Sequence, residues 1–192
     1  MATPIQVIAG LGNPGPRYSA TRHNAGFMLV DMLTEHAGAG PWKTWQNIGE
    51  YCRAELPSGP LYLIKPLTYM NDSGRMLASF CGFYKLQPDS VLVCFDDMAL
   101  NLGAIRLRLG GSAGGQKGMA DILQCLGTQD VPRLRIGTGP RPPQFEAKDF
   151  VLASFSSQEK KTLHEALEKA KDAALVCADT GVEAAMNRFN GG

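Results

Sequence analysis

Two short apolar runs of this 192-residue chain constrain its fold more than any other feature. One covers residues 5–9 and ends at a glycine, and the other covers residues 91–95 and ends at Asp96-Asp97. Short apolar runs bounded in this way are typical of strands buried on both faces of a sheet. Between them, residues 24–36 carry apolar side chains at helical spacing and stop at a glycine-rich segment. Strand-like and helix-like segments therefore alternate, which predicts an α/β fold.

The remaining segments continue this alternation. Residues 104–109 alternate between apolar and polar side chains, which predicts a half-buried strand whose outer face carries Arg106 and Arg108. We expect a hairpin at 51–56 and 61–64, strands at 133–137 and 150–155, and helices at 73–84, 119–126 and 182–189. A capping-box pattern at 156–159 predicts one more helix, running through residue 176. Residues 1–192 show no repeat and no linker, so we expect one globular domain, a mixed twisted β-sheet flanked by helices.

The composition argues against several classes of protein. Charged residues make up 19% of the chain and the formal net charge is +1, unlike a chain coated with positive charge for nucleic acid. Five cysteines without a CxxC pair indicate reduced thiols, and three separated histidines offer no recognisable metal site. The sequence shows neither an export signal nor an apolar run of membrane-spanning length. We therefore expect a cytoplasmic protein with no metal and no membrane partner.

The glycine-rich loop at residues 10–15 (GLGNPG) matches the letters of the dinucleotide-binding fingerprint. The fingerprint requires a helix that starts within the loop, so that free backbone N–H groups meet a pyrophosphate. Here Pro14 and Pro16 remove two of those donors, and the next helix is expected only near Asn24. We therefore expect no nucleotide cofactor. We expect the loop to hold Asn13 as a positioned amide instead.

His23 lies just before the first expected helix and is the candidate catalytic group. A neutral imidazole is the usual general base near pH 7. Asp96 follows an apolar strand, where open α/β sheets carry their functional groups, so its carboxylate is placed to orient an imidazole. No serine or cysteine lies in a nucleophile pattern such as GxSxG. Water is therefore the expected nucleophile.

Asn71 precedes the helix expected at residues 73–84 and has two interpretations. In the first, Asp72 or Ser73 caps the helix, Met70 packs in the core, and Asn71 has no special role. In the second, Asn71 aims its amide into a cleft, where it donates to a carbonyl or accepts from a peptide N–H. The spacing of these residues leaves both interpretations open.

Basic residues cluster in the second half of the chain. Between residues 101 and 141, six basic residues stand against two acidic ones, a local net charge of +4. Two expected strands in this region each carry arginine at positions i and i+2, beside a glycine loop rich in backbone N–H groups. This combination is a candidate phosphate-binding surface.

Together these motifs resemble the bacterial-type peptidyl-tRNA hydrolase family along nearly the whole chain. The resemblance is carried by residues 10–15 (GLGNPG), 18–26 (YSATRHNAG), 65–74 (KPLTYMNDSG), 96–97 (DD) and 110–115 (GGSAGG). Members of this family cleave the ester between a peptide and the terminal ribose of tRNA, recycling tRNA dropped by stalled ribosomes. The resemblance implies a metal-free, cytoplasmic, monomeric enzyme of a single α/β domain, whose partner is peptidyl-tRNA.

The resemblance also implies roles for the matched residues. His23 would be the general base on a water, with Asp96 stabilising its basic form. Asn13 would distinguish peptidyl from free aminoacyl substrates through the blocked amine, and Arg108 and Arg135 would hold the 5′ phosphate of the tRNA. The remaining matched positions would bind tRNA or peptide near the ester: Tyr18, Tyr69, Met70, Asn71, Gln116 and Lys117.

The glycine loop departs from the family pattern, which usually continues Gly-Gly-His-Asn-Gly, because residues 114–118 here are GGQKG. Lys117 has three interpretations: it grips a phosphate or a developing oxyanion, it keeps His23 neutral, or it weakens peptide recognition. Residues 114–116 also resemble the Gly-Gly-Gln tripeptide of translation release factors, which hydrolyse the same bond. The alternative function is an RNA-binding member of the same fold with weakened catalysis.

Overall fold

The two apolar runs pair side by side at the centre of a seven-stranded sheet in the computed structural model, which describes residues 4–191. The strands are β1 (Val7–Gly10), β2 (Lys43–Trp45), β3 (Gly49–Leu56), β4 (Gly59–Pro66), β5 (Val91–Asn101), β6 (Ile105–Arg108) and β7 (Arg133–Gly139). Their order is β2-β3-β4-β1-β5-β7-β6. The four central strands β4, β1, β5 and β7 are parallel, while β3 and β6 run antiparallel to their neighbours. The predicted mixed sheet is confirmed.

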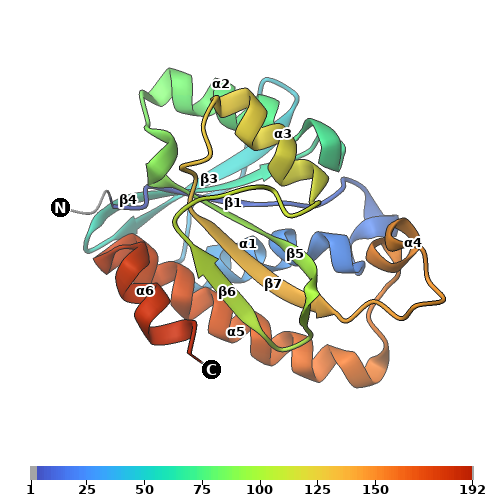
Figure 1. The fold of residues 1–192 in the computed structure, drawn as a ribbon. Helices are drawn as coiled ribbons and strands as arrows, with labels where there is room; N and C mark the ends of the chain where they lie inside the picture. The colour runs from blue at the N-terminus through green and yellow to red at the C-terminus, as the bar shows by residue number, and fades with distance from the viewer. Residues whose placement is uncertain (1–3, 192) are drawn as a thin grey trace.

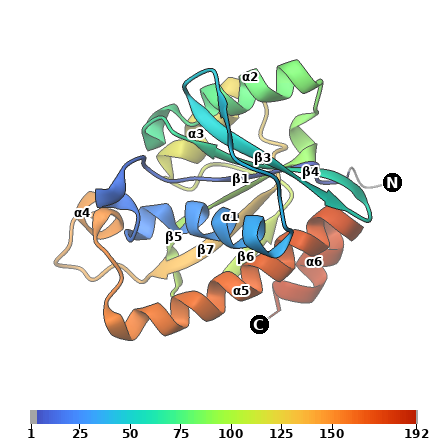
Figure 2. The same cartoon turned by 180° about the vertical axis from the view of Figure 1, so that it is seen from behind.

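Helices cover both faces of this sheet. They are α1 (Ala25–His36), α2 (Gly74–Tyr84), α3 (Lys117–Leu126), α4 (Ala147–Leu152), α5 (Ser157–Thr180) and α6 (Val182–Phe189). Figures 1 and 2 show α1, α5 and α6 on one face and α2 and α3 on the other. Because neighbouring residues of a strand point to opposite faces, β1 serves both layers. Its Ile8 belongs to the core beneath α1, α5 and α6, and its Val7 belongs to the core beneath α2 and α3.

Most predicted elements lie within a few residues of the observed ones, but several differ. The strand predicted at residues 91–95 continues to Asn101, so Asp96 and Asp97 lie inside β5 rather than after it. Four short 3-10 turns join the longer elements: η1 (Pro16–Tyr18), η2 (Arg22–Asn24), η3 (Met70–Asp72) and η4 (Pro88–Ser90). The edge strand β2 was not predicted, because its three residues are mostly exposed and carry no apolar alternation.

The strand predicted at residues 150–155 is wrong. The first part of this segment belongs to the helix α4, and Ser154 makes only an isolated bridge to Thr21. The apolar residues of this segment led to the prediction of a buried strand. Phe150 is indeed buried, but its side chain is covered by the guanidinium of Arg22 rather than by a neighbouring strand. A contact between residues so far apart in the chain leaves no local signal.

The helix α1 sits unusually close to the sheet because two glycines face each other. A Cβ atom on Gly10 of β1 would lie 2.2 Å from the carbonyl oxygen of Gly26. A Cβ atom on Gly26 would lie 2.3 Å from the carbonyl oxygen of Cys94 in β5 and 2.4 Å from the backbone nitrogen of Leu11. Gly10, which begins the motif at residues 10–15, and Gly26 of α1 therefore allow the helix to pack closely on the strands. The adjoining turn η2 is thereby brought beside the end of β1 and the middle of β5.

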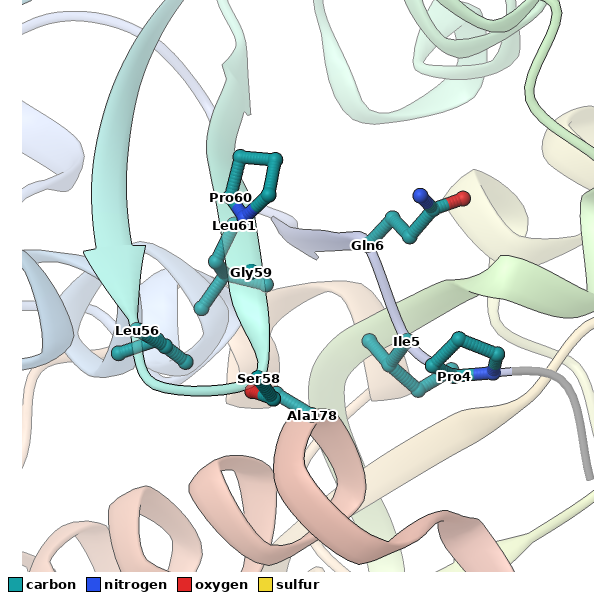
Figure 3. A pocket seen from close by; sticks show the side chains of 9 residues that line it. All are labelled: Pro4, Ile5, Gln6, Leu56, Ser58, Gly59, Pro60, Leu61 and Ala178. Atoms are coloured by element: carbon teal, nitrogen blue, oxygen red, sulfur yellow. The ribbon is translucent and has the colours of Figure 1, made fainter.

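The amino end of β1 offers little room for a ligand. Figure 3 shows a small cavity there, lined by residues 4–6, 56, 58–61 and Ala178. Its volume is about 50 Å³, enough for a water or two rather than a substrate. Within residues 4–191, no helix is long and apolar enough to cross a membrane, and no three His, Cys, Asp or Glu side chains are grouped to hold a metal ion.

We predict that Gly26→Ala destabilises the protein. The added methyl group overlaps the backbone of both β1 and β5, and overpacking of this kind costs about 1–3 kcal/mol. Gly82→Ala in α2 is the matched control, since a Cβ atom there has no neighbour within 4 Å. That change should raise the free energy of unfolding by about 0.5–1 kcal/mol. Urea unfolding of both variants checks the prediction, and equal effects would contradict it.

Candidate active site

Polar side chains gather where the parallel strands end. The loop after β1 carries Asn13, the segment after β4 carries residues 69–71, and β5 itself carries Asp96. The turn η2 carries His23 to the same edge, because α1 packs against β1 and β5. This is the edge at which open α/β sheets bind their ligands.

A cavity of about 600 Å³ opens at this edge. That volume is in the range of small-molecule sites, which run from about 300 to 1,000 Å³. All of the residues predicted for the site line it, except Tyr18, Arg108 and Arg135. The full lining is Asn13, His23, Tyr69, Met70, Asn71, Asp96, Asp97, Met98, Gly114, Gly115, Gln116, Lys117, Ala147, Lys148, Val151 and Leu152.

His23 and Asp96 form a hydrogen-bonded pair in the wall of the cavity. Nδ1 of His23 lies 2.8 Å from Oδ1 of Asp96, and the two side chains are 13% and 2% exposed. An ionised carboxylate only accepts hydrogen bonds, so Nδ1 carries a proton and donates the hydrogen bond to Asp96. The other ring nitrogen, Nε2, then keeps its lone pair. The pair therefore offers a proton acceptor to a molecule bound in the cavity.

Asn13 is held from both sides. Its backbone N–H donates to Oδ1 of Asn24 at 2.9 Å, and Nδ2 of Asn24 donates back to the carbonyl oxygen of Asn13 at 3.0 Å. Its side-chain Oδ1 accepts from the backbone N–H of Met70 at 2.9 Å. These contacts fix the orientation of the carboxamide. Its Nδ2 has no partner among residues 4–191, so Asn13 presents a donor at the cavity.

The two residues that depart from the family pattern also line the cavity. Gln116 is the N-cap of α3, and its Oε1 accepts from the backbone N–H of Met119 at 2.7 Å. Its Nε2 lies 3.3 Å from Oδ1 of Asp96. Lys117 is the first residue of α3, is exposed, and makes no ion pair within the described part of the chain. The loop thus places one amide against Asp96 and one free ammonium group at the cavity.

The segment around Asn71 shows features of both interpretations, because Met70 is buried in the core while Asn71 is exposed at the cavity. Neither Asp72 nor Ser73 caps α2 with its side chain; instead Asp121 of α3 accepts from the backbone N–H of Gly74 at 2.6 Å. The hydroxyl of Ser73 donates to the carbonyl oxygen of Met70. Asn71 is exposed and lines the cavity, so its amide is available to a ligand.

The two predicted tyrosines lie in different surroundings. Tyr69 lines the cavity, and 60% of its surface is exposed. Tyr18 lies in η1, outside the cavity lining, with the guanidinium of Arg17 stacked 4.5 Å from the centre of its ring. The structure therefore brings Tyr69, but not Tyr18, to the cavity.

The arginines of β6 and β7 share one face of the sheet. Arg106 stands opposite Arg135, and Arg108 stands opposite Arg133. Arg106 and Arg108 are exposed. Nε of Arg135 donates to Oδ2 of Asp97, the cavity-lining neighbour of the catalytic candidate Asp96, at 2.5 Å. This ion pair fixes the guanidinium of Arg135 and leaves both of its Nη atoms without a partner among residues 4–191.

Arg133 has a structural role. Its buried guanidinium donates to four backbone carbonyl oxygens, of which those of Gly111 and Ser112 lie at 2.8 and 2.7 Å. Burial lowers the pKa of this guanidinium from its ordinary value, with smaller contributions from the positive charges of Arg135 and Arg108. The hydrogen bonds hold the glycine loop that leads to Gln116 and Lys117.

The sequence analysis did not include the wall opposite this loop. Helix α4 contributes Ala147, Lys148, Val151 and Leu152, and β5 contributes Met98. Their signal was lost when residues 150–155 were interpreted as a strand. Helical spacing at 147, 148, 151 and 152 was the pattern that would have revealed this wall.

Arg22, next to His23, attaches the α4 wall to the rest of the site. Its guanidinium donates to the carbonyl oxygens of Ala153 and Ser154 and makes a two-fold hydrogen bond to the carboxylate of Glu159, at 2.7 and 2.9 Å. It also stacks on the ring of Phe150 at 4.5 Å. The residue before the candidate base therefore holds the connection between α4 and α5.

The site and fold point to a class of protein. An imidazole hydrogen-bonded to a buried carboxylate, in a large cavity at the ligand-binding edge of an α/β sheet, is an arrangement typical of enzymes that use acid–base chemistry.

Comparison with known proteins gives the family. The sequence model of the family described as peptidyl-tRNA hydrolase matches residues 7–192. The peptidyl-tRNA hydrolase of Elusimicrobium minutum is 52% identical over 186 residues, which are 97% of this chain and 99% of that protein. That of Thermotoga petrophila is 43% identical, covering 96% of each chain. A crystal structure of the peptidyl-tRNA hydrolase from Acinetobacter baumannii matches with a TM-score of 0.90 and 35% identity, over 97% of this chain and 95% of that one. The chain belongs to the peptidyl-tRNA hydrolase family and is an enzyme with that hydrolase activity.

We predict that Glu159→Gln lowers the free energy of unfolding, and that the loss is largest at neutral pH. Burial tends to raise the pKa of the Glu159 carboxyl, but hydrogen bonds from Ser156 and Arg22 outweigh it, and its pKa lies below the ordinary value. A group with a lowered folded pKa stabilises the protein above its unfolded pKa, and loses that effect as the pH falls through the folded value. Loss of a charged hydrogen bond costs about 1–3 kcal/mol.

Urea unfolding between pH 7.5 and pH 3 checks this. The difference between Glu159→Gln and the unmodified protein should shrink as the pH approaches and passes below about 4.3, the ordinary glutamate pKa. Glu165→Gln is the matched control, an exposed glutamate of α5 without an ion pair in the described structure. A difference that stays constant with pH would contradict the role of the Glu159 charge.

Proposed function

We propose that His23, oriented by Asp96, is the general base through which this enzyme hydrolyses the ester of peptidyl-tRNA. The observation that carries the proposal is the 2.8 Å contact between Nδ1 of His23 and Asp96, in the wall of the large cavity. The contact leaves Nε2 as the proton acceptor. General-base assistance of this kind contributes about 10²–10⁴-fold to a rate.

The proposed reaction has two proton transfers. Nε2 of His23 takes a proton from water as the water oxygen bonds to the ester carbon, which gives a tetrahedral intermediate. The bond from that carbon to the ribose oxygen then breaks, and the imidazolium returns its proton to the departing ribose oxygen. Asp96 stabilises the imidazolium that exists between these steps. The products are free tRNA and the peptide carboxylic acid.

We further propose that Asn13 recognises the blocked amine of the substrate. Because its Oδ1 is occupied by the N–H of Met70, the group it presents is the Nδ2 donor. A peptidyl substrate carries an amide carbonyl near its ester, which accepts such a hydrogen bond. A free aminoacyl-tRNA carries an ammonium group, which is itself a donor and repays none of the desolvation of Asn13. The orientation of Asn13 thus supports its proposed role in discrimination.

Other cavity residues are proposed to contact the substrate near the ester. Tyr69 and Asn71 are exposed at the cavity, and Met70 lines it from beneath, buried against the first turn of α3. Lys117 carries a free positive charge suited to a phosphate of the tRNA end or to the developing oxyanion. For Tyr18, the proposed contact rests on the family resemblance alone, since its ring is not in the cavity lining.

We propose that Arg108 and Arg135 hold the 5′ phosphate of the tRNA. Both lie on the same face of β6 and β7, Arg108 is exposed, and Arg135 has free Nη atoms. A guanidinium that is fixed at Nε and free at both Nη atoms suits the forked binding of a phosphate. We propose that the enzyme acts as a monomer, as the family resemblance implies. A cytoplasmic location follows from the substrate, since peptidyl-tRNA arises on ribosomes.

We predict that His23→Ala lowers kcat by about 10²–10⁴-fold. His36→Ala, an exposed histidine at the end of α1, is the matched control and should leave kcat unchanged. Release of tRNA from an N-blocked aminoacyl-tRNA measures the activity, and gel-shift binding to the same tRNA measures affinity. Full activity of His23→Ala would refute the proposed base. Tight tRNA binding by the unmodified protein without any cleavage would favour the alternative of an RNA-binding member.

We predict that Arg108→Ala and Arg135→Ala raise KM by about tenfold each and leave kcat within about twofold, because the phosphate contact is the same in ground and transition states. Arg53→Ala is the matched control, an exposed arginine on β3, away from the β6–β7 face. Steady-state kinetics at fixed ionic strength distinguish the outcomes. A fall in kcat with an unchanged KM would contradict the phosphate-binding role.

A further inference from the structure

The orientation of the Gln116 side chain is set by the helix it begins. The backbone N–H of Met119 donates to Oε1 of Gln116 at 2.7 Å, so the oxygen end of the carboxamide faces α3. The nitrogen end must then face the cavity wall. There Nε2 lies 3.2 Å from Sδ of Met70 and 3.3 Å from Oδ1 of Asp96. The helix cap therefore aims the amide donor at the carboxylate.

Oδ1 of Asp96 receives two donors. One is Nδ1 of His23 and the other is Nε2 of Gln116, and the Asp96 side chain is only 2% exposed. A carboxylate this buried needs hydrogen bonds to offset its lost hydration. Two donors from different elements, η2 and α3, also restrict rotation of the carboxylate. The position of the acceptor that orients His23 thus depends on Gln116.

The donors of Gln116 are already used within the protein. A primary carboxamide has two N–H groups, and here one is directed at Asp96 and the other at the sulfur of Met70. Its oxygen caps α3. A substrate that bound to this side chain would have to displace one of these contacts. The geometry therefore favours a role toward Asp96 over a contact with the peptide or tRNA.

We propose that Gln116 is a positioning residue for catalysis: it holds Asp96 against His23 and, being unable to titrate, does so equally at every working pH. The proposal rests on the proposed function of His23. The family pattern has a histidine at this position, whose donor depends on its tautomer and charge. In this chain the second donor to the carboxylate is permanent.

The other charged groups around the pair lie on β5 itself and on β7, α3 and α4. Asp97 of β5 is paired with Arg135 of β7, and Lys117 of α3 and Lys148 of α4 are exposed at the cavity. None of these lies within hydrogen-bond distance of Asp96 or His23 in the described structure. The variants below can therefore be compared through the acid limb of the pH profile of kcat/KM, the side on which activity falls as the pH is lowered.

The variant Gln116→Glu tests the donor end of the side chain separately from the end that caps α3. A glutamate keeps an oxygen for the cap of α3 but replaces the donor with a second carboxylate oxygen facing Asp96. We expect kcat to fall by about 10–100-fold with KM within about twofold, since the base is misplaced and the substrate contacts remain. We also expect the acid limb to move to higher pH, because a second negative charge favours the imidazolium. Gln124→Glu, an exposed position on the same helix, is the matched control for the added charge.

A second variant, Gln116→His, tests the importance of a donor that does not titrate. Its kcat should be higher than that of Gln116→Glu but lower than that of the unmodified enzyme, and its acid limb should show one more ionisation. Thermal unfolding checks that each variant is folded, and the NMR signal of the His23 Nδ1–H, without substrate, reports the pair independently of turnover. In Gln116→Glu we expect this signal to shift.

The outcomes are distinct. A raised KM with unchanged kcat and acid limb would show that Gln116 contacts the substrate and would overturn the proposal. Unchanged kcat, KM and NMR signal would overturn it as well. Failure of the proposed function would appear separately, as full activity of His23→Ala, whatever the Gln116 variants do.

Discussion

The backbone contact of α1 with the end of β1 and with the first half of β5 is the constraint on which the site depends. Gly10 and Gly26 allow it, since a side chain on either would overlap the backbone opposite. The turn η2 directly precedes α1, and Asp96 lies two residues beyond Cys94, whose carbonyl oxygen Gly26 approaches. The distance between His23 and Asp96 is therefore set by helix–strand packing. Hydrogen bonding then completes a geometry that the backbone has already established.

Side chains that join one loop to another hold the rest of the catalytic edge. Asn13 binds the backbone of Met70, and Gln116 contacts both Met70 and Asp96. Arg22 ties the α4–α5 connection to the turn that carries His23. Segments from four parts of the chain are thus linked to one another as well as to the sheet. Such cross-links keep loop residues at fixed distances, which the proposed general base requires.

The sequence predicted the fold well wherever the signal was periodic or local. The apolar faces of α1 and α2 and the capping box of α5 all correspond to observed elements. Helix α4 was missed because its burial depends on Arg22, more than a hundred residues earlier in the chain. The length of β5 was underestimated because Asp96 and Asp97 look like a strand end, although both remain paired with β7.

The sequence predicted which residues form the site better than it predicted how their side chains are oriented. The resemblance named the residues at the cavity, and the structure brings eight of these positions together, from Asn13 to Lys117. What the sequence could not supply is the orientation of amides. Whether Asn13 presents its oxygen or its nitrogen depends on Met70, and the direction of Gln116 depends on Met119. Such choices follow from contacts between loops and leave no trace in residue spacing.

The internal role of Arg133 lowers the number of positive charges that the proposed phosphate-binding face of β6 and β7 offers to a polyanion. The guanidinium of Arg133 is buried against backbone carbonyl oxygens. The positive groups left on the face are therefore Arg106, Arg108 and the free end of Arg135. Binding to a polyanion gains free energy by releasing the cations condensed on its phosphates, roughly one for each phosphate neutralised. A buried arginine releases none. The counterions displaced by this surface are therefore fewer than the number of arginines on the two strands.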